Sequence, residues 1–410
     1  MPRALRTSRL VAALRSELRT LRQGVVALAL STAAGFVAGL ILSHITGALE
    51  RLPGLLVLIP AAVGMRGTIF GAVAARLGTS IHAGLFHATI RREGPLRDNV
   101  TVAVVTTFTS SLWLAVLAKL TATVFGDPSI SIVRLVVISV VGGTLGSVVI
   151  LSVTIVLSVA SYRRGWDLDA VGTPMVTALG DAATLPTLFL ASLLTRSDLL
   201  TASIAVACGV AVAWSVATVM RTTRPAVRRI VVQMAAVIAL TPLLDIAAGG
   251  LLGRFQSDLV QNAGILILIP PFVSQSGALG GILASRLSSK IQLGLVRPSA
   301  RPSALAWIDA GVVSILSVVT FLAVGAGATV LAELTARAHP GAAEMIGGTL
   351  LAGSMMLPAI LLLSYGVAVA TARFGLDPDD QSVPIITSAM DLAGVIAVLL
   401  AMAALGVFHR

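Results

Sequence analysis

Long apolar stretches separated by short polar segments run along the whole chain. A helix needs about 20 apolar residues to cross the hydrocarbon layer of a membrane. By that measure the pattern predicts eleven membrane-spanning helices, although their ends are soft. Their ranges are 24–47, 54–80, 99–124, 131–160, 170–195, 199–219, 231–252, 263–288, 306–331, 346–371 and 381–407. We therefore expect an all-α polytopic membrane protein.

The composition supports the same class. Hydrophobic residues make up 56% of the chain and charged residues only 11%, too few to cover the surface of a soluble domain of this length. The low aromatic share of 4%, together with 38 glycines, suits helices that pack closely in lipid. A membrane barrel would instead show short segments of alternating hydrophobicity.

The net charge of +11 comes largely from basic residues between the apolar stretches. Most of these lie on the side of the membrane that also holds the six arginines of residues 1–23. The opposite side holds only Arg51, Arg196, Arg254, Arg337 and Arg410. Because cytoplasmic loops carry the excess of Lys and Arg, we expect the N-terminus inside and the C-terminus outside a cell (inner or plasma) membrane. Aromatic residues do not interleave with the basic ones, so the expected partner is membrane lipid and not nucleic acid.

Cysteine and histidine form no recognisable site. The single cysteine, Cys208, lies inside an apolar stretch and is expected to be a small buried hydrophobic residue. The five histidines are scattered, with neither zinc spacing nor a catalytic pairing. A membrane enzyme would need a nucleophile–base pair or a metal cluster, so we expect no enzyme activity and no organic cofactor.

An internal repeat with a constant offset of 210 residues runs through the sequence. Residues 58–85 read LIPAAVGMRGTIFGAVAARLGTSIHAGL, and residues 268–295 read LIPPFVSQSGALGGILASRLSSKIQLGL. The same offset relates Gly143 to Gly353, Arg163 to Arg373, Asp167 to Asp377, Asp169 to Asp379, Pro174 to Pro384, Thr177 to Thr387 and Asp181 to Asp391. One offset over so long a stretch indicates a duplicated unit.

Each unit contains five spans, so a direct fusion would invert the second unit. The span at 199–219 has no partner in the repeat, and it restores the first orientation. We therefore expect two parallel five-helix repeats joined by an extra linker helix, a fused pseudo-dimer with its axis along the membrane normal. The expected divisions are a basic cytoplasmic segment at 1–23, a first membrane unit at 24–197, a linker helix at 198–230 and a second membrane unit at 231–410.

One carboxylate in each unit falls near the middle of the membrane. The helix that contains Asp169 starts near the cytoplasmic face, and Asp181 lies about 18 Å further along it. Asp391 holds the same place in the second unit. Ionisable groups at this depth are costly and are functional by default. Two carboxylates balance a divalent cation, and oxygen ligands suit Mg²⁺, which keeps most of its water. The alternative is that Ser, Thr or Arg side chains simply satisfy the two aspartates.

A recurring pattern, Asp-x-Asp-x₄-Pro-x₂-Thr-x₃-Asp, precedes each of these aspartates. The proline frees a backbone carbonyl one turn earlier. That carbonyl and the oxygens of Thr177 and Thr387 could face a hydrated cation. The first two aspartates of each copy lie at the inner mouth, where they could either concentrate cations or cap the helix N-terminus. They are Asp167 and Asp169 in the first unit and Asp377 and Asp379 in the second.

The second span of each unit contains a polar, glycine-bearing stretch, Gly64–Gly67 in one and Ser274–Gly277 in the other. We expect both helices to be broken there, as in spans that line a cavity. Arg66 would repel a passing cation, so we expect it to pair with a carboxylate or to point to an interface. Asp245 and Asp309 have no acidic counterparts in the first unit, and we expect both to be satisfied interface residues.

These residues resemble the MgtE-type magnesium transporters, especially the animal solute-carrier relatives that fuse two MgtE membrane units in one chain. Gly64-Met65-Arg66-Gly67 followed by Ala74–Thr79 is similar to that branch's Gly-Leu-Lys-Gly-Asn…Ala-Ser-Arg-Leu-Ser-Thr signature, and Ala284–Ser289 is more similar still. Thr68 and Ala278 replace the asparagine of that signature.

The resemblance extends over nearly the whole chain after residue 24. Val171–Asp181 and Gln381–Asp391 are similar to the family's last membrane helix. The resemblance implies that Asp181 and Asp391 are pore carboxylates and that the backbone near Thr177 and Thr387 lines the site.

We therefore expect a transporter or channel for a divalent cation, with Mg²⁺ the first candidate and a pore between the two repeats. Another divalent ion such as Mn²⁺ or Co²⁺ is a rival, although neither Cys nor His accompanies the paired aspartates. A non-transporting membrane scaffold is a rival from another class. Passive flow, Na⁺ exchange and H⁺ coupling all fit the same residues.

Overall fold

The computed structural model describes residues 25, 28–45, 47, 52, 54–87, 89, 94–126, 129–164, 168–292, 294–299, 301–374 and 378–408. Within these residues the chain is helical and contains no strand. In the part of the chain that the structure describes, nine helices have the length and apolar composition of membrane spans, and Leu28–His44 is a shorter apolar helix. The predicted all-α polytopic membrane fold is confirmed.

The helices follow the predicted order closely. The first unit contains Leu28–His44, α3 (Leu55–His82), α4 (Pro95–Phe125), α5 (Ile132–Arg164) and α6 (Leu168–Leu193). A short 3₁₀ turn, η1 (Leu194–Arg196), leads to the linker helix α7 (Asp198–Arg221). The second unit contains α8 (Pro225–Arg254), the short α9 (Gln256–Gln261), α10 (Ala263–Gln292), α11 (Ala304–Leu334), α12 (Ala342–Phe374) and α13 (Pro378–Ala404).

The expectation of broken second spans is wrong. Both α3 and α10 run as continuous helices through Gly64–Gly67 and Ser274–Gly277. Glycine in a helix costs only about 1 kcal/mol relative to alanine and keeps every backbone hydrogen bond, so packing can override its propensity. These small residues serve instead to let neighbouring helices approach closely.

The two units exchange their first helices. Gly39, on Leu28–His44, lies against the backbone of α10, and a Cβ added to it would stand 2.8 Å from the Ile267 Cα. Gly249, on α8, lies against the backbone of α3, and a Cβ there would stand 2.9 Å from the Val57 Cα. Both glycines and both partners are 210 residues apart, so the contact is reciprocal, as in an isologous interface.

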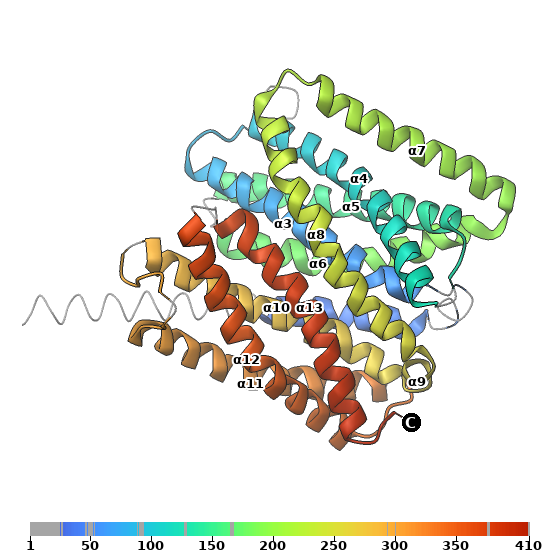
Figure 1. Cartoon of the computed structure of the whole chain (residues 1–410), viewed down its shortest axis with the longest axis vertical. Helices are drawn as coiled ribbons and strands as arrows, with labels where there is room; N and C mark the ends of the chain where they lie inside the picture. Colours follow the sequence, from blue (N-terminus) through green and yellow to red (C-terminus); the bar gives the residue numbers. More distant parts are fainter. Residues whose placement is uncertain are drawn as a thin grey trace, which may run out of the picture.

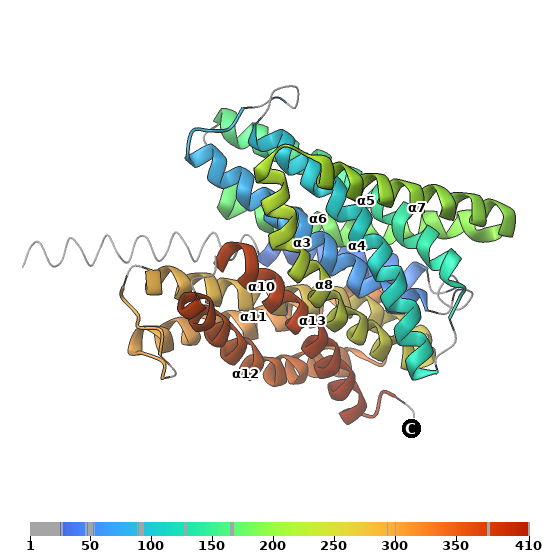
Figure 2. The same cartoon turned by 45° about the horizontal axis from the view of Figure 1, so that its top comes forward.

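The seam between the units is therefore built from helices of both. Figures 1 and 2 show α8 crossing from the side of the blue-to-green first unit to that of the orange-to-red second unit. Helix α8 packs on α3 and on α13, and α13 also touches α3. This arrangement brings the midpoints of α3, α8 and α13 together.

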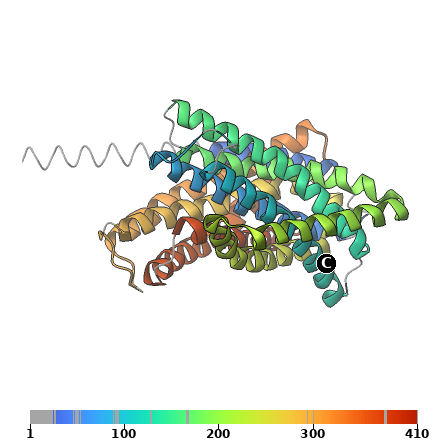
Figure 3. The same cartoon turned by 90° about the horizontal axis from the view of Figure 1, so that it is seen from above.

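The linker helix α7 lies along the outside of the first unit, where it packs against α4 and α5 (Figures 1 and 3). Most of its surface is uncovered and apolar: Leu199, Val206, Trp214 and Met220 are all largely exposed. Cys208 is buried, as expected for a small hydrophobic residue. A helix that is apolar all round and covered on one side suits a lipid-facing position.

Candidate cation site

Two carboxylates meet at Gly64, near the middle of α3. A Cβ added to Gly64 would lie 2.8 Å from Asp245 Oδ2 and 3.4 Å from Asp391 Oδ2. The two oxygens are therefore at most 6.2 Å apart, the sum of those distances. Only the absence of a side chain at Gly64 leaves room for both groups against α3.

Asp181 completes a group of three. The carboxylate of Asp391 interacts electrostatically with both Asp245 and Asp181. The hydroxyl of Ser274, on α10, is close enough to interact with the carboxylate of Asp181, and it lies 2.9 Å from the Ser31 hydroxyl. Ser274 and Gly64 are equivalent positions of the repeat, so each unit's second span meets the aspartate of the other unit.

The three carboxylates differ in burial. Asp245 is fully buried, whereas Asp181 and Asp391 keep partly exposed surfaces despite their depth among the helices. The neighbouring positions Val63, Gly64 and Ser274 are also partly exposed, although most of α3 and α10 around them is buried. Solvent can therefore reach this part of the seam.

Asp245 is not the satisfied interface residue that was expected. Its Oδ1 has no hydrogen-bond partner among the described residues, and its Oδ2 accepts only a long bond of 3.4 Å from the Ser388 hydroxyl. It lies on the buried face of α8 together with Thr241, Ala248 and Leu252, which are spaced three to four residues apart. Asp245 has no acidic counterpart in the repeat, so the sequence pattern did not predict that it lies beside Asp391.

The counterpart of Asp245 is Gly35, and packing explains the difference. A Cβ at Gly35 would stand only 2.6 Å from the Cα of Pro271, so that position admits no side chain. The residue equivalent to Pro271 in the first unit is the smaller Ala61. An intramembrane carboxylate is functional by default, and that general rule was the one signal in the sequence that could have identified Asp245.

Asp309, by contrast, is the satisfied residue that was expected. Its carboxylate lies 2.8 Å from Arg286 Nη2 and 2.7 Å from Lys290 Nζ, far from the group at Gly64 in sequence and on another pair of helices. The equivalent positions in the first unit are also paired, because Arg76 Nε donates to Asn99 Oδ1 at 2.8 Å.

The described structure shows little of the remaining predicted site residues. The Thr387 hydroxyl donates to the Pro384 carbonyl at 3.0 Å, within its own helix. Asp169 and Asp379 lie in the first turns of α6 and α13. The side chains of Thr177, Asp169 and Asp379, like the whole of Asp167 and Asp377, lie outside the described residues.

The described carboxylates do not form a cage for a bare metal ion. Among the described residues, no group of three or more His, Cys, Asp or Glu side chains is arranged to hold a metal directly. A hydrated Mg²⁺ needs no such cage, because it keeps several waters and is bound through one or two carboxylates. Widely set carboxylates around a partly exposed seam fit a hydrated divalent ion better than a dehydrated one.

Arg66 does not pair with the aspartates. Its guanidinium turns away from the seam, donating from Nη1 to the Ala62 carbonyl at 2.6 Å and to Thr184 Oγ1 at 3.3 Å. It therefore points to the interface of α3 with α4, α5 and α6, one of the two outcomes expected for it.

Known proteins with similar sequences confirm the repeat and identify the family. The solute carrier family 41 member 3 of Rattus norvegicus is 23% identical over 398 residues, covering 92% of this chain and 86% of the relative. The solved eukaryotic MATE transporter AtDTX14 covers 96% of both chains, but at 12% identity and a TM-score of 0.36 the likeness is too slight to interpret. The pattern of the MgtE family, described as divalent cation transporter, matches residues 59–191 and 269–401, two segments offset by the same 210 residues as the repeat. The chain therefore belongs to the MgtE family of divalent cation transporters.

Proposed function

We propose that this protein carries hydrated Mg²⁺ through the seam between its two units, past Asp181 and Asp391. The observation that carries the proposal is the meeting of one duplicated carboxylate from each unit at the seam, within electrostatic reach of one another. Three uncompensated carboxylates in a membrane interior repel one another, and a divalent cation removes much of that repulsion.

The donors at the seam favour a hard cation. Carboxylates and the hydroxyls of Ser274 and Ser388 provide oxygen only. Hard oxygen ligands suit Mg²⁺ and also Mn²⁺, whereas a softer ion such as Zn²⁺ or Cu⁺ gains more from imidazole or thiolate ligands. The one cysteine is on α7, at the outside of the first unit. Thr177, Thr387 and the mouth residues Asp167, Asp169, Asp377 and Asp379 belong to the same proposed path, with the mouth residues concentrating cations at its inner end.

The proposed path also carries a topology. Two parallel units, 24–197 and 231–410, form a fused pseudo-dimer about an axis along the membrane normal, and the linker helix within 198–230 restores the orientation of the second unit. The reciprocal packing of Gly39 on α10 and Gly249 on α3 supports this two-fold relation. The N-terminus lies in the cytoplasm and the C-terminus outside the cell membrane.

The test is Mg²⁺ uptake into proteoliposomes loaded with a Mg²⁺-sensitive dye. We expect the wild-type protein to transport Mg²⁺ and Asp391→Asn to transport about 10- to 100-fold less, because the substitution removes a charge at the centre of the path and keeps its shape. Asp198→Asn is the matched control, since it makes the same chemical change at an exposed carboxylate paired with Arg134 at 3.0 Å. Wild-type rates in a folded Asp391→Asn variant would overturn the site.

The same vesicles separate the rival functions. If Mn²⁺ or Co²⁺ is transported well above the rate of Mg²⁺, that ion is the substrate, and the proposed path through the seam still stands. Absence of any divalent flux from well-folded protein would favour a scaffold. Imposed Na⁺ and pH gradients distinguish passive flow from exchange, because only a coupled transporter responds to a gradient of the coupling ion.

A further inference from the structure

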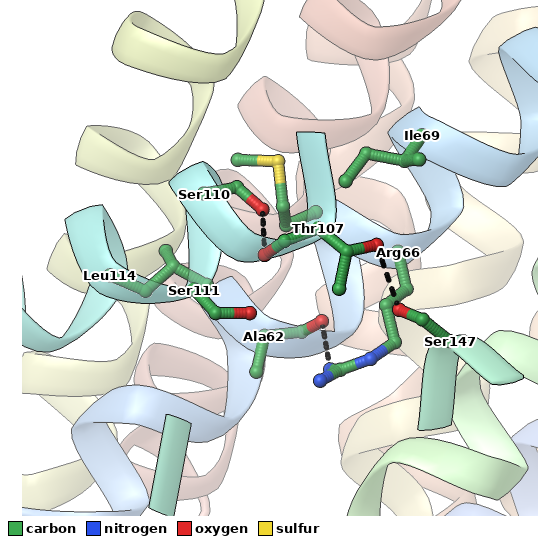
Figure 4. A pocket seen from close by; sticks show the side chains of 9 residues that line it. Ala62, Arg66, Ile69, Thr107, Ser110, Ser111, Leu114 and Ser147 are labelled. Atoms are coloured by element: carbon green, nitrogen blue, oxygen red, sulfur yellow. Dashed lines mark hydrogen bonds between the residues drawn. The ribbon is translucent and has the colours of Figure 1, made fainter. Parts of the chain in front are cut away.

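A small cavity with both polar and apolar walls lies inside the first unit, between α3, α4 and α5. Its volume is about 10 Å³, which is enough for about one water-sized particle. Figure 4 shows Arg66 and the hydroxyls of Thr107, Ser110, Ser111 and Ser147 around it. The cavity lies apart from the carboxylates of the seam.

The charge of Arg66 is not compensated at this cavity. The side chain is only 5% exposed, and no described carboxylate forms an ion pair with it. Its Nε is buried without a hydrogen-bond partner, and both bonds that it makes to described residues come from Nη1 and go to neutral oxygens. A buried guanidinium without a counter-ion is expensive in a membrane interior, and this cost favours an anion beside it.

The hydroxyls around the cavity have hydrogens to spare. Thr107 donates to the Ser147 hydroxyl at 3.1 Å, and the Ser147 hydroxyl itself donates to no acceptor among the described residues. The Ser111 hydroxyl makes no hydrogen bond there either, and it lies beside Gly143, where an added Cβ would stand 3.3 Å from Arg66 Nη2. Together with the guanidinium of Arg66, these hydroxyls line the cavity with hydrogen-bond donors and add no negative charge. A ligand that only accepts hydrogen bonds fits such a set better than water, which must also donate.

The second unit supplies an internal comparison. Ser276 stands at the position of Arg66, and Phe321 stands at the position of Ser111. Phe321 stacks on Phe272 with ring centroids 4.7 Å apart, and it packs against Gly353 as Ser111 packs against Gly143. Two aromatic rings therefore occupy the equivalent region of the unit that lacks the guanidinium. In the first unit the cavity and the guanidinium therefore occur together, whereas the described part of the second unit has a serine and two rings at the equivalent positions.

We propose that the cavity beside Arg66 binds one small inorganic anion of the halide class, with chloride as the physiological ligand. Room for about one water-sized particle suits a monatomic ion better than a polyatomic anion such as sulfate or phosphate. Arg66 supplies the charge, and Ser111 and Ser147 supply hydroxyl donors. The bound anion neutralises the guanidinium of Arg66. The Cβ of Arg66 lies 3.9 Å from where a Cβ on Gly180 would stand, and Gly180 is the residue before Asp181. If the proposed cation path is correct, the anion also removes a fixed positive charge from its flank, but binding itself is independent of transport.

The experiment measures thermal unfolding of the purified full-length protein in NaCl and in sodium gluconate at equal ionic strength. A ligand that binds only the folded state raises the melting temperature in proportion to its occupancy. We expect chloride and bromide to raise the melting temperature of the wild-type protein by about 2–4 °C over gluconate. Equal melting temperatures in sodium chloride, sodium bromide and sodium gluconate would overturn the proposal.

Variants assign the effect to the cavity. Arg66→Gln should abolish the halide-dependent shift, and Ser147→Ala should reduce it while leaving the guanidinium in place. Ser276→Ala, at the equivalent position of Arg66 in the second unit, is the matched control and should keep the full shift. If Arg66→Gln does not fold, Ser111→Val and Ser147→Ala carry the test, because each removes one donor and leaves the charge.

Bromide locates the ligand directly. An anomalous bromide peak beside Arg66 in crystals of the wild-type protein is the expected result. A peak that is absent there, or a halide-dependent shift that survives both Ser111→Val and Ser147→Ala, would overturn the site. Neither measurement depends on Mg²⁺ transport, so failure of the anion site and failure of the cation path are distinguishable.

Discussion

The two units share one backbone plan but fill it differently behind their second spans. In the first unit a guanidinium and several hydroxyls surround a small cavity between α3, α4 and α5. In the second unit the stacked rings of Phe272 and Phe321 occupy the corresponding region between α10 and α11. The two units align in sequence at an offset of 210 residues, so the difference between these regions lies in the side chains at equivalent positions. Duplication preserved the helix packing and left the space behind it free to diverge.

A second difference lies at the seam itself. Asp181 and Asp391 are equivalent residues, but Asp245 has Gly35 as its counterpart, and Ser274 has Gly64. The first span of the second unit thus contributes a carboxylate to the seam, whereas the first span of the first unit contributes none. A duplicated chain can build an asymmetric site around a symmetric pair, which a homodimer of identical units cannot do.

The largest expected effect tests the symmetric part of the site. Asp181→Asn and Asp391→Asn should each lower Mg²⁺ flux by about 10- to 100-fold, and the double variant should lose little more, because residues that act as a unit are non-additive. Dye-reported uptake into proteoliposomes measures all three. Independent, multiplying losses would show that the two aspartates act at separate sites.

The next effect tests the asymmetric part. Asp245→Asn should lower the apparent Mg²⁺ affinity by about 3- to 10-fold, because it removes one of three charges that face the ion and leaves the symmetric pair intact. Concentration-dependent uptake gives the affinity separately from the maximal rate. Asp258→Asn on the short helix α9 serves as the control. An unchanged affinity would restore Asp245 to the role of an interface residue.

A smaller effect is expected from the counterparts Gly64 and Ser274. Gly64→Ala places a methyl group 2.8 Å from Asp245 Oδ2, so the carboxylates must shift, and we expect uptake to fall about 3-fold. Ser274→Ala removes one hydroxyl next to Asp181 without crowding it and should lower uptake less. Equal effects of the two substitutions would argue against the unequal packing of the two second spans around the carboxylates.

The smallest effect on transport is expected away from the seam. Asp309→Asn makes the second unit resemble the first, where Asn99 accepts from Arg76. The change removes a carboxylate that is 0% exposed and holds Arg286 and Lys290, so unfolding should become easier by about 1–3 kcal/mol. Uptake per folded molecule should stay at the wild-type rate. Thermal unfolding and uptake of the same preparation check both statements, and loss of transport at normal stability would contradict them.

Much of the fold follows from local rules that a sequence already obeys. Span lengths follow from the thickness of the membrane, and the duplication follows from a constant offset of 210 residues, which the two family matches share. The depth of Asp181 and Asp391 follows from counting helix turns. The expectation of broken second spans failed because glycine propensity was weighed without the neighbours that fill the space beside it. Asp245 was misjudged because the repeat was used as the test of function, and a residue without a counterpart fails that test.

The sequence by itself determined the class, the repeat and the family, because each depends on residue type and spacing along one chain. Only the tertiary structure decided which residues meet. The reciprocal exchange of first helices brings Asp245 to Gly64 and Asp391, and the side chains of α4 and α5 leave a cavity beside Arg66 where α10 and α11 hold two rings. Such contacts join residues on different helices that are far apart in the sequence, and they depend on steric fit between helix surfaces. No periodicity within a single helix records that fit.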